Sequence, residues 1–339
     1  MDTQKLDQTY IANTYARFPV TIVKGKGSLV WDDTGKEYID LSTGIAVDIF
    51  GVADEEWMAA VTKQLGTLQH ISNLYYTEPC VKLAQMLCEK TGMKKVFFGN
   101  SGAEANECAI KAARKWSEEK KGKDYSTIIT LKNSFHGRTI TTLAATGQDV
   151  FHHDFTPLTE GFVYAEPNDL ANLEQLIKAN KCAAVMMEVV QGEGGVMPLD
   201  EAYVKGAAKL CEQYDLLLIC DEVQVGNGRS GKLYGYMHYG IQPDIVSTAK
   251  GLAGGLPLGA TLLGEKVQDV LSAGTHGSTF GGNPVCCAGA INVLSRLDEK
   301  MLEGVEERSA YIKQELAGAK GVLGVSGLGL MLGIQTEKN

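Results

Sequence analysis

Four ionisable side chains stand near the ends of predicted buried strands. Asp221 and Lys250 each directly follow an apolar run, while Glu188 lies within another such run and Glu193 just beyond it. A carboxylate at the end of an apolar strand is costly to bury unless it is paired. Taken singly, Asp221 could be a helix cap or half of a buried ion pair, and Lys250 a surface lysine. On neighbouring strand ends, they indicate a site that combines an acid with an amine.

A glycine-containing turn adds an anion-binding element. Residues 98–106, Phe-Gly-Asn-Ser-Gly-Ala-Glu-Ala-Asn, run from a predicted strand into a predicted helix, whose first turn favours phosphate. Alone the signal is weak, because many helices start after Ser-Gly and the glycines lack the Walker or dinucleotide spacing. Together with Asp221 and Lys250, however, the turn matches the needs of pyridoxal phosphate (PLP). These are a phosphate anchor, an acid that keeps the pyridine nitrogen protonated, and a lysine for a Schiff base.

The elements that must position these groups alternate between strand and helix from about residue 80. Apolar runs separated by helices are typical of an α/β fold with a mostly parallel sheet covered on both faces. In such sheets, ligands bind at the carboxyl ends of the strands. The predicted strands are 95–98, 127–131, 183–190, 216–220, 244–247 and 260–263, and the predicted helices are 80–90, 103–116 and 201–214.

The chain is expected to divide into a large domain and parts of a smaller one. Residues 20–41 predict a small antiparallel unit near the N-terminus. We therefore expect residues 1–50 to form the N-terminal part of a small domain. Residues 51–295 are expected to form the large domain, and residues 296–339 to start a C-terminal small domain.

Composition disfavours several functional classes. The formal net charge of −9 disfavours nucleic-acid binding. No uncharged apolar stretch reaches about 18 residues, so no membrane span is predicted. The N-terminus has no apolar signal core. The eight cysteines lack metal-site spacing and are interpreted as free thiols in a reducing compartment. No metal site and a cytoplasmic location are therefore expected.

Five motifs, in this order, resemble those of class III aminotransferases, which are PLP-dependent enzymes of fold type I. They are Asn-Ser-Gly-Ala-Glu-Ala-Asn-Glu at 100–107, Phe-His-Gly-Arg-Thr at 135–139, Asp-Glu-Val-Gln at 221–224, Ala-Lys-Gly at 249–251 and Gly-Ser-Thr-Phe-Gly-Gly-Asn-Pro at 277–284. The motifs span most of the chain, and chance agreement of five ordered motifs is negligible. Within the class, residues 72–76 and 133–139 look most like those of acetylornithine aminotransferases.

The resemblance implies a role for each matching residue. Lys250 would hold PLP as a Schiff base and then transfer the substrate proton, while Asp221 would pair with the pyridinium nitrogen. The other implied contacts are Ser101, Gly102 and Ala103 at the phosphate, Phe135 and Val223 on the two ring faces, Gln224 at the ring hydroxyl, and Thr279 at the phosphate of the neighbouring subunit. The role of Thr279 implies a homodimer with shared active sites.

The resemblance also implies how substrates are held. Arg138 would bind the substrate α-carboxylate, because its planar guanidinium suits that group. Tyr15 and Glu193 are weaker candidates on the substrate side, and His136 is interpreted as structural. The implied reaction moves an amino group from an ω-amino donor, foremost N-acetylornithine, to 2-oxoglutarate and yields glutamate, as in arginine biosynthesis. Ornithine, succinylornithine, 4-aminobutyrate and lysine are alternative donors. A truncated PLP-binding protein with impaired turnover is an alternative from a different class.

The sequence departs from the family pattern in two places. Family members usually continue further and carry a second carboxylate-binding arginine, and Ser326 stands at one position where arginine is common. Glu193 would then lack its distal partner, and residues 328–332 would form an exposed apolar surface. Residues 51–57 replace a Gly-His-x-His-Pro-like stretch. Either the sequence is a fragment or it holds its substrate differently, and both readings stay open.

Overall fold

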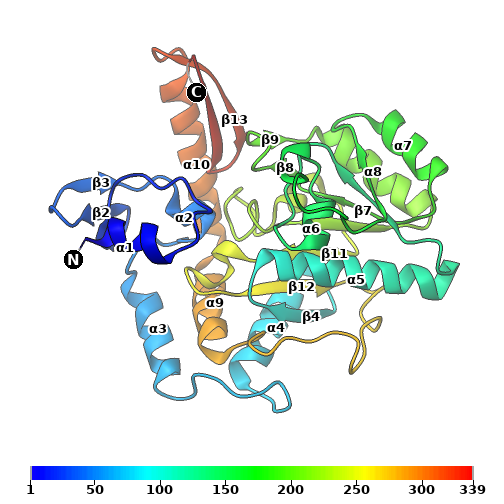
Figure 1. Cartoon of the computed structure of the whole chain (residues 1–339), viewed down its shortest axis with the longest axis horizontal. Helices are drawn as coiled ribbons and strands as arrows, with labels where there is room; N and C mark the ends of the chain where they lie inside the picture. Colours follow the sequence, from blue (N-terminus) through cyan, green and yellow to red (C-terminus); the bar gives the residue numbers. More distant parts are fainter. Residues whose placement is uncertain (1, 338–339) are drawn as a thin grey trace.

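A seven-stranded sheet forms the centre of the computed structural model, which describes residues 2–337 (Figure 1). The strand order is β4-β12-β11-β10-β7-β5-β6, and only β12 runs antiparallel to its neighbours. The strands are β4 (Lys95–Gly99), β5 (Thr127–Leu131), β6 (Phe162–Ala165), β7 (Cys182–Met187), β10 (Leu217–Asp221), β11 (Ile245–Thr248) and β12 (Gly259–Leu263). The predicted α/β fold with a mostly parallel sheet is confirmed.

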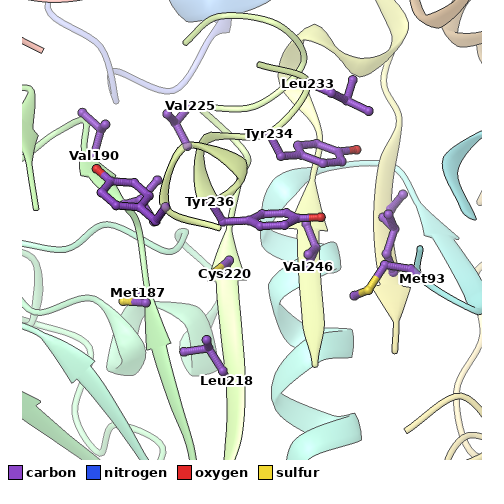
Figure 2. Close-up of a cluster of buried hydrophobic side chains, with 14 of the residues drawn as sticks. Met93, Met187, Val190, Leu218, Cys220, Val225, Leu233, Tyr234, Tyr236 and Val246 are labelled. Atoms are coloured by element: carbon purple, nitrogen blue, oxygen red, sulfur yellow. The ribbon is translucent and has the colours of Figure 1, made fainter. Parts of the chain in front are cut away.

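The two faces of this sheet have separate apolar cores. On one face, the long helix α5 (Gly102–Lys121) lies across the strands (Figure 1), and its fully buried small side chains, such as Ala109 and Ala113, allow close packing. The other face is covered by α4 (Glu78–Thr91), α7 (Leu170–Ala179) and α8 (Glu201–Gln213). Figure 2 shows part of this second core, where the stacked rings of Tyr234 and Tyr236 lie above β10 and β11. Each strand is therefore apolar on both faces.

Smaller elements surround the sheet. The antiparallel unit predicted within residues 20–41 is present as β1 (Ile22–Lys26), β2 (Leu29–Asp32) and β3 (Glu37–Ile39). The remaining elements are α1 (Thr3–Tyr10), α2 (Thr43–Ala46), α3 (Glu55–Leu65), α6 (Ile140–Ala145), η1 (Asp149–Phe151), β8 (Val190–Gln191), β9 (Met197–Pro198), η2 (Gly235–Tyr239), η3 (Lys250–Ala253), α9 (Pro284–Arg296), α10 (Glu299–Leu316), β13 (Val322–Leu328) and β14 (Met331–Thr336). No helix within residues 2–337 is long and apolar enough to cross a membrane.

The C-terminal hairpin β13–β14 corrects one expectation. Residues 328–332 do not form an exposed apolar surface, because Met331 is only 5% exposed and Leu328 packs against the main core. The backbone N–H of Leu330 donates to the carbonyl of Arg229 at 2.9 Å. The chain around Arg229 thus covers the apolar turn of the hairpin.

Glu222 anchors η2 to the end of β10. Its carboxylate is fully buried and accepts hydrogen bonds from the backbone N–H groups of Gly235 (2.7 Å) and Tyr236 (2.8 Å). Burial raises the pKa of Glu222 to about 8, although both hydrogen bonds oppose the rise. The folded protein therefore holds a proton on Glu222 at pH values where the unfolded chain has released it.

This proton predicts a pH dependence of stability. Because the native state binds more protons than the unfolded state between about pH 4.5 and pH 8, the free energy of unfolding should fall as the pH rises through this range. The glutamine in Glu222→Gln is neutral and still offers one hydrogen-bond acceptor. The free energy of unfolding of this variant should therefore depend less on pH, and at low pH it should be about 1 kcal/mol below that of the parent. Urea unfolding of the cofactor-free protein across this range measures the slope. The exposed Glu212→Gln on α8 is the control and should follow the parent; equal slopes for parent and Glu222→Gln would contradict the assignment.

Candidate active site

Asp221, the last residue of β10, is a buried carboxylate with three hydrogen-bond donors. Its Oδ2 accepts from Asn106 Nδ2 of α5 (2.8 Å) and from His136 Nδ1 (2.7 Å), and its Oδ1 accepts from the backbone N–H of Val223 (3.0 Å). Only 3% of Asp221 is exposed. Donors of this kind replace the solvent contacts that a buried carboxylate gives up. The arrangement can hold a negative charge ready for a cationic partner.

His136 is in direct contact with this carboxylate. Burial alone would lower the pKa of His136, but the hydrogen bond to Asp221 and its charge outweigh that effect and raise the pKa. Within residues 2–337, the buried His136 Nε2 and Asn106 Oδ1 have no hydrogen-bond partner. Buried polar atoms without partners are uncommon, and they fit a site that receives a polar ligand or water.

Lys250 starts η3 directly beyond β11, in a strained backbone conformation. Its φ angle of +46° lies in the left-handed region, which is unfavourable for lysine. Asn227 holds the preceding backbone, because its Nδ2 donates to the carbonyl of Ala249 (3.0 Å) and to Thr248 Oγ1 (3.1 Å). Lys250 Nζ donates to Gln224 Oε1 at 2.8 Å. The strained turn aims the amine at the residues that follow β10.

The surroundings of Lys250 favour a reactive amine. Burial lowers the pKa of Lys250, and the charges of Asp221, Glu193 and Glu188 partly offset this effect. A desolvated lysine with a lowered pKa is a better nucleophile and proton acceptor than an exposed one.

The start of α5 offers the predicted anion seat. Ser101 is the N-cap residue, and its Oγ accepts from the N–H of Glu104 at 3.2 Å. The N–H groups of Gly102 and Ala103 come next, in the first turn, where a helix supplies no partner of its own. Val223 lies so close that a Cβ at Gly102 would be 2.6 Å from Val223 Cγ1. Glycine at this position therefore brings Val223 beside the anion seat.

The loop after β5 carries Phe135 and Arg138. Phe135 is half-buried and meets Phe151 edge-on, with ring centroids 5.8 Å apart. The guanidinium carbon of the exposed Arg138 lies 4.2 Å from the Phe151 ring centroid and 5.5 Å from that of Phe135. Stacking uses the flat face of the guanidinium and leaves its N–H edge for an anion. Stacking thus holds Arg138 beside Phe135 and Phe151, and no ion pair joins it to an acid among residues 2–337.

Two predicted residues lie apart from this cluster, and a third, Glu193, lies at its exposed edge. Tyr15 is 69% exposed in the N-terminal segment, where Arg17 stacks on its ring at 5.2 Å. Thr279 is exposed and lines a surface pocket of about 410 Å³ with Ser72. Glu193 is exposed in the loop between β8 and β9 and makes no ion pair within the described part of the chain. The structure thus brings together Ser101, Gly102, Ala103, Phe135, Asp221, Val223, Gln224 and Lys250. Glu193 lies within electrostatic reach of Lys250, whereas Tyr15 and Thr279 lie outside the cluster.

Sequence reasoning gave no role to Asn106 or Asn227, and it misplaced Glu188. The predicted strand 183–190 placed Glu188 inside a strand, but β7 ends at Met187, and the chain pairs again only at Val190 and Gln191, with β9 in a separate small sheet. Asn106 lies inside a motif matched above, which was the available signal for it. No local signal marks Asn227, because its partners appear only when the chain folds.

Comparisons with known proteins agree with this site. The chain matches the Aminotransferase class-III family over residues 10–339. It is 51% identical over 336 residues to an acetylornithine aminotransferase of Haemophilus ducreyi, covering 99% of this chain and 86% of that protein. It is 44% identical over 328 residues to a succinylornithine transaminase of Citrobacter koseri, covering 95% of this chain and 80% of that protein.

The fold superposes on an ornithine aminotransferase of Toxoplasma gondii, reported with PLP at partial occupancy in its active site. The TM-score is 0.94 at 35% identity, covering 98% of this chain and 81% of that one. The chain belongs to the class III aminotransferases.

Proposed function

We propose that this chain binds PLP at Lys250 and transfers the amino group of N-acetylornithine, or of a similar ω-amine, to 2-oxoglutarate to give glutamate. The observation that carries the proposal is the pairing of two side chains at neighbouring strand ends. Asp221 is buried and accepts three hydrogen bonds, and Lys250 has a pKa that burial lowers. Relatives named for acetylornithine and succinylornithine support an acylated ornithine as the donor. A role in arginine biosynthesis follows from that donor, and a cytoplasmic location is proposed from the eight free cysteines.

The residues present fit PLP. The buried Asp221 carboxylate suits a pyridinium nitrogen, and the free N–H groups of Gly102 and Ala103, with Ser101, suit a phosphate. When bound, PLP supplies an electron sink that stabilises negative charge at the substrate carbon. Asp221 keeps that sink effective, because its charge favours the protonated ring.

The protein's own residues then bind and orient the substrates and move the proton. Lys250, with its lowered pKa, accepts the proton from the substrate carbon and returns it. Phe135 and Val223 would hold the cofactor ring between them, and Gln224 would bind the ring hydroxyl. Arg138 orients the α-carboxylate of each substrate. Glu193 and Tyr15 are further candidates on the substrate side.

A homodimer with shared sites belongs to the same proposal. Large apolar side chains near the predicted Thr279 contact are exposed in the single chain, among them Leu74 (88%), Tyr76 (100%) and Phe280 (59%). Exposed apolar surface of this kind favours a protein partner. In the proposed dimer, Thr279 of each subunit reaches the phosphate held by the other.

We also propose the division into a large domain and two parts of a small one. The parts are residues 1–50, 51–295 and 296–339. The first includes β1–β3, the last includes α10 and the β13–β14 hairpin, and the middle part holds every residue assigned above to the cofactor.

A donor panel tests the proposed reaction. With 2-oxoglutarate as acceptor, kcat/KM for N-acetylornithine should exceed that for ornithine, 4-aminobutyrate and lysine by about tenfold or more. Steady-state assays measure these values, and the absorbance change of bound PLP with donor alone measures the half-reaction. If PLP binds and no donor changes its absorbance, the protein binds PLP without useful turnover and the proposed function is wrong.

Asp221→Asn tests the acid. An amide keeps the size of the side chain but cannot favour a protonated ring, so PLP should stay bound while turnover falls by about 10²-fold or more. Equilibrium dialysis with PLP and steady-state kinetics measure the two quantities. Turnover near that of the parent would show that Asp221 is not the nitrogen partner.

Arg138→Lys tests the carboxylate site. Lysine keeps the charge but loses the planar fork, so KM should rise about tenfold for both the amino donor and 2-oxoglutarate. Arg308→Lys, on the exposed side of α10, is the matched control and should leave both KM values unchanged. A rise for one substrate alone would refute a shared carboxylate site.

A further inference from the structure

A second buried carboxylate, Glu188, stands beside Asp221. Met187, the last residue of β7, is the partner of Cys220 of β10 in the parallel register, and the strands are about 4.8 Å apart. Glu188 and Asp221, the next residues, therefore leave this pair of strands side by side. Side chains alternate along a strand, and Met186 and Ile219 belong to the core under α5. Glu188 and Asp221, two residues further on, therefore point to the same face, toward α5.

The Glu188 carboxylate joins two loops of the site. Its Oε1 accepts from the backbone N–H of Phe135 at 2.7 Å, and its Oε2 accepts from that of Gly192 at 3.2 Å. A Cβ at Gly192 would lie 2.6 Å from Gln224 Cδ, so this loop packs directly on the side chain that accepts from Lys250. One side chain thus ties the Phe135 loop to the Gln224–Lys250 pair.

Glu188 also lies within electrostatic reach of the reactive groups. It is 5% exposed, and the titratable groups that act on it are His136 in the loop after β5 and Asp221 on β10. Burial raises the pKa of Glu188 to about 7, and Asp221 adds to the rise while His136 opposes it. Lys250 in turn responds to Asp221, Glu193 and Glu188. The charge of Glu188, which acts on Lys250, therefore changes around neutral pH.

We propose that Glu188 is a positioning residue for the proposed reaction: its carboxylate holds the Phe135 and Gly192 loops together and places an acid within electrostatic reach of Lys250. The inference rests on the proposed function, because it takes Lys250 as the lysine that binds PLP. Among the described residues, Glu188 is the buried carboxylate that accepts from both loops, while the Phe135 loop also donates to Asp221 through His136 Nδ1.

The test compares Glu188→Gln with Glu222→Gln. Glu222 is equally buried and also accepts from two backbone N–H groups, but alternation along β10 places it on the opposite face of the sheet. For each variant, cofactor-free protein is mixed with PLP at a series of pH values, reduced with borohydride and digested for peptide mapping. The pH midpoint of Lys250 labelling and the Kd for PLP are measured.

Glu188→Gln removes a negative charge that favours the protonated amine, so the midpoint of Lys250 labelling should move to lower pH. It also gives up one of two hydrogen bonds, so the Kd for PLP should rise about tenfold. Glu222→Gln should leave the midpoint unchanged. An unmoved midpoint or Kd in Glu188→Gln, or an equal midpoint shift in Glu222→Gln, overturns the inference.

Glu188→Asp keeps the test decisive if Glu188→Gln does not fold. The shorter acid retains the charge but cannot reach both N–H groups, so the midpoint should stay at the parent value while the Kd for PLP rises. A shifted midpoint or an unchanged Kd in this variant overturns the inference. If Lys250 of the parent is not labelled at all, the proposed function fails instead, which separates the two conclusions.

Discussion

A buried negative charge at Asp221 is the constraint on which the rest of the site depends. An ionised carboxylate away from water costs several kcal/mol unless hydrogen bonds replace its solvent. Its donors come from three separate elements: Asn106 on α5, His136 in the loop after β5, and Val223 in the turn after β10. To satisfy this one carboxylate, the fold must place the helix with the anion seat, the aromatic loop and the turn before Gln224 in fixed positions.

The sheet topology makes that placement available. The strands β7, β10 and β11 are parallel neighbours, so Glu188, Asp221 and Lys250 emerge at the same edge. The antiparallel β12 begins at this edge as well, where Gly259 lies against Ser101. A Cβ at Gly259 would be 2.2 Å from the Ser101 carbonyl oxygen, so only glycine lets β12 start beside the anion seat. The one antiparallel strand therefore helps to fix the start of α5.

The sequence predicted what depends on local pattern and missed what depends on distant contacts. Apolar runs marked the strands, so the acid at Asp221 and the amine at Lys250 were found at the strand ends. The partners of Asn106 lie 30 and 115 residues away, and no spacing reveals such bonds. The end of β7 was also hidden, because residues 183–190 are almost continuously apolar while their last part pairs with β9. Apolarity indicates burial, but it does not identify the strand that will be the partner.

The C-terminal hairpin also bears on the reactive amine. Gly333 of β14 packs on the loop between β8 and β9, since a Cβ there would be 3.0 Å from Val196 Cβ. This loop carries Glu193, whose charge raises the pKa of Lys250 against the effect of burial. The sequence suggested that Glu193 lacks an arginine partner, but a carboxylate acts on a nearby amine through distance and local dielectric alone. By packing on this loop, the hairpin helps to fix the position of Glu193 relative to the amine.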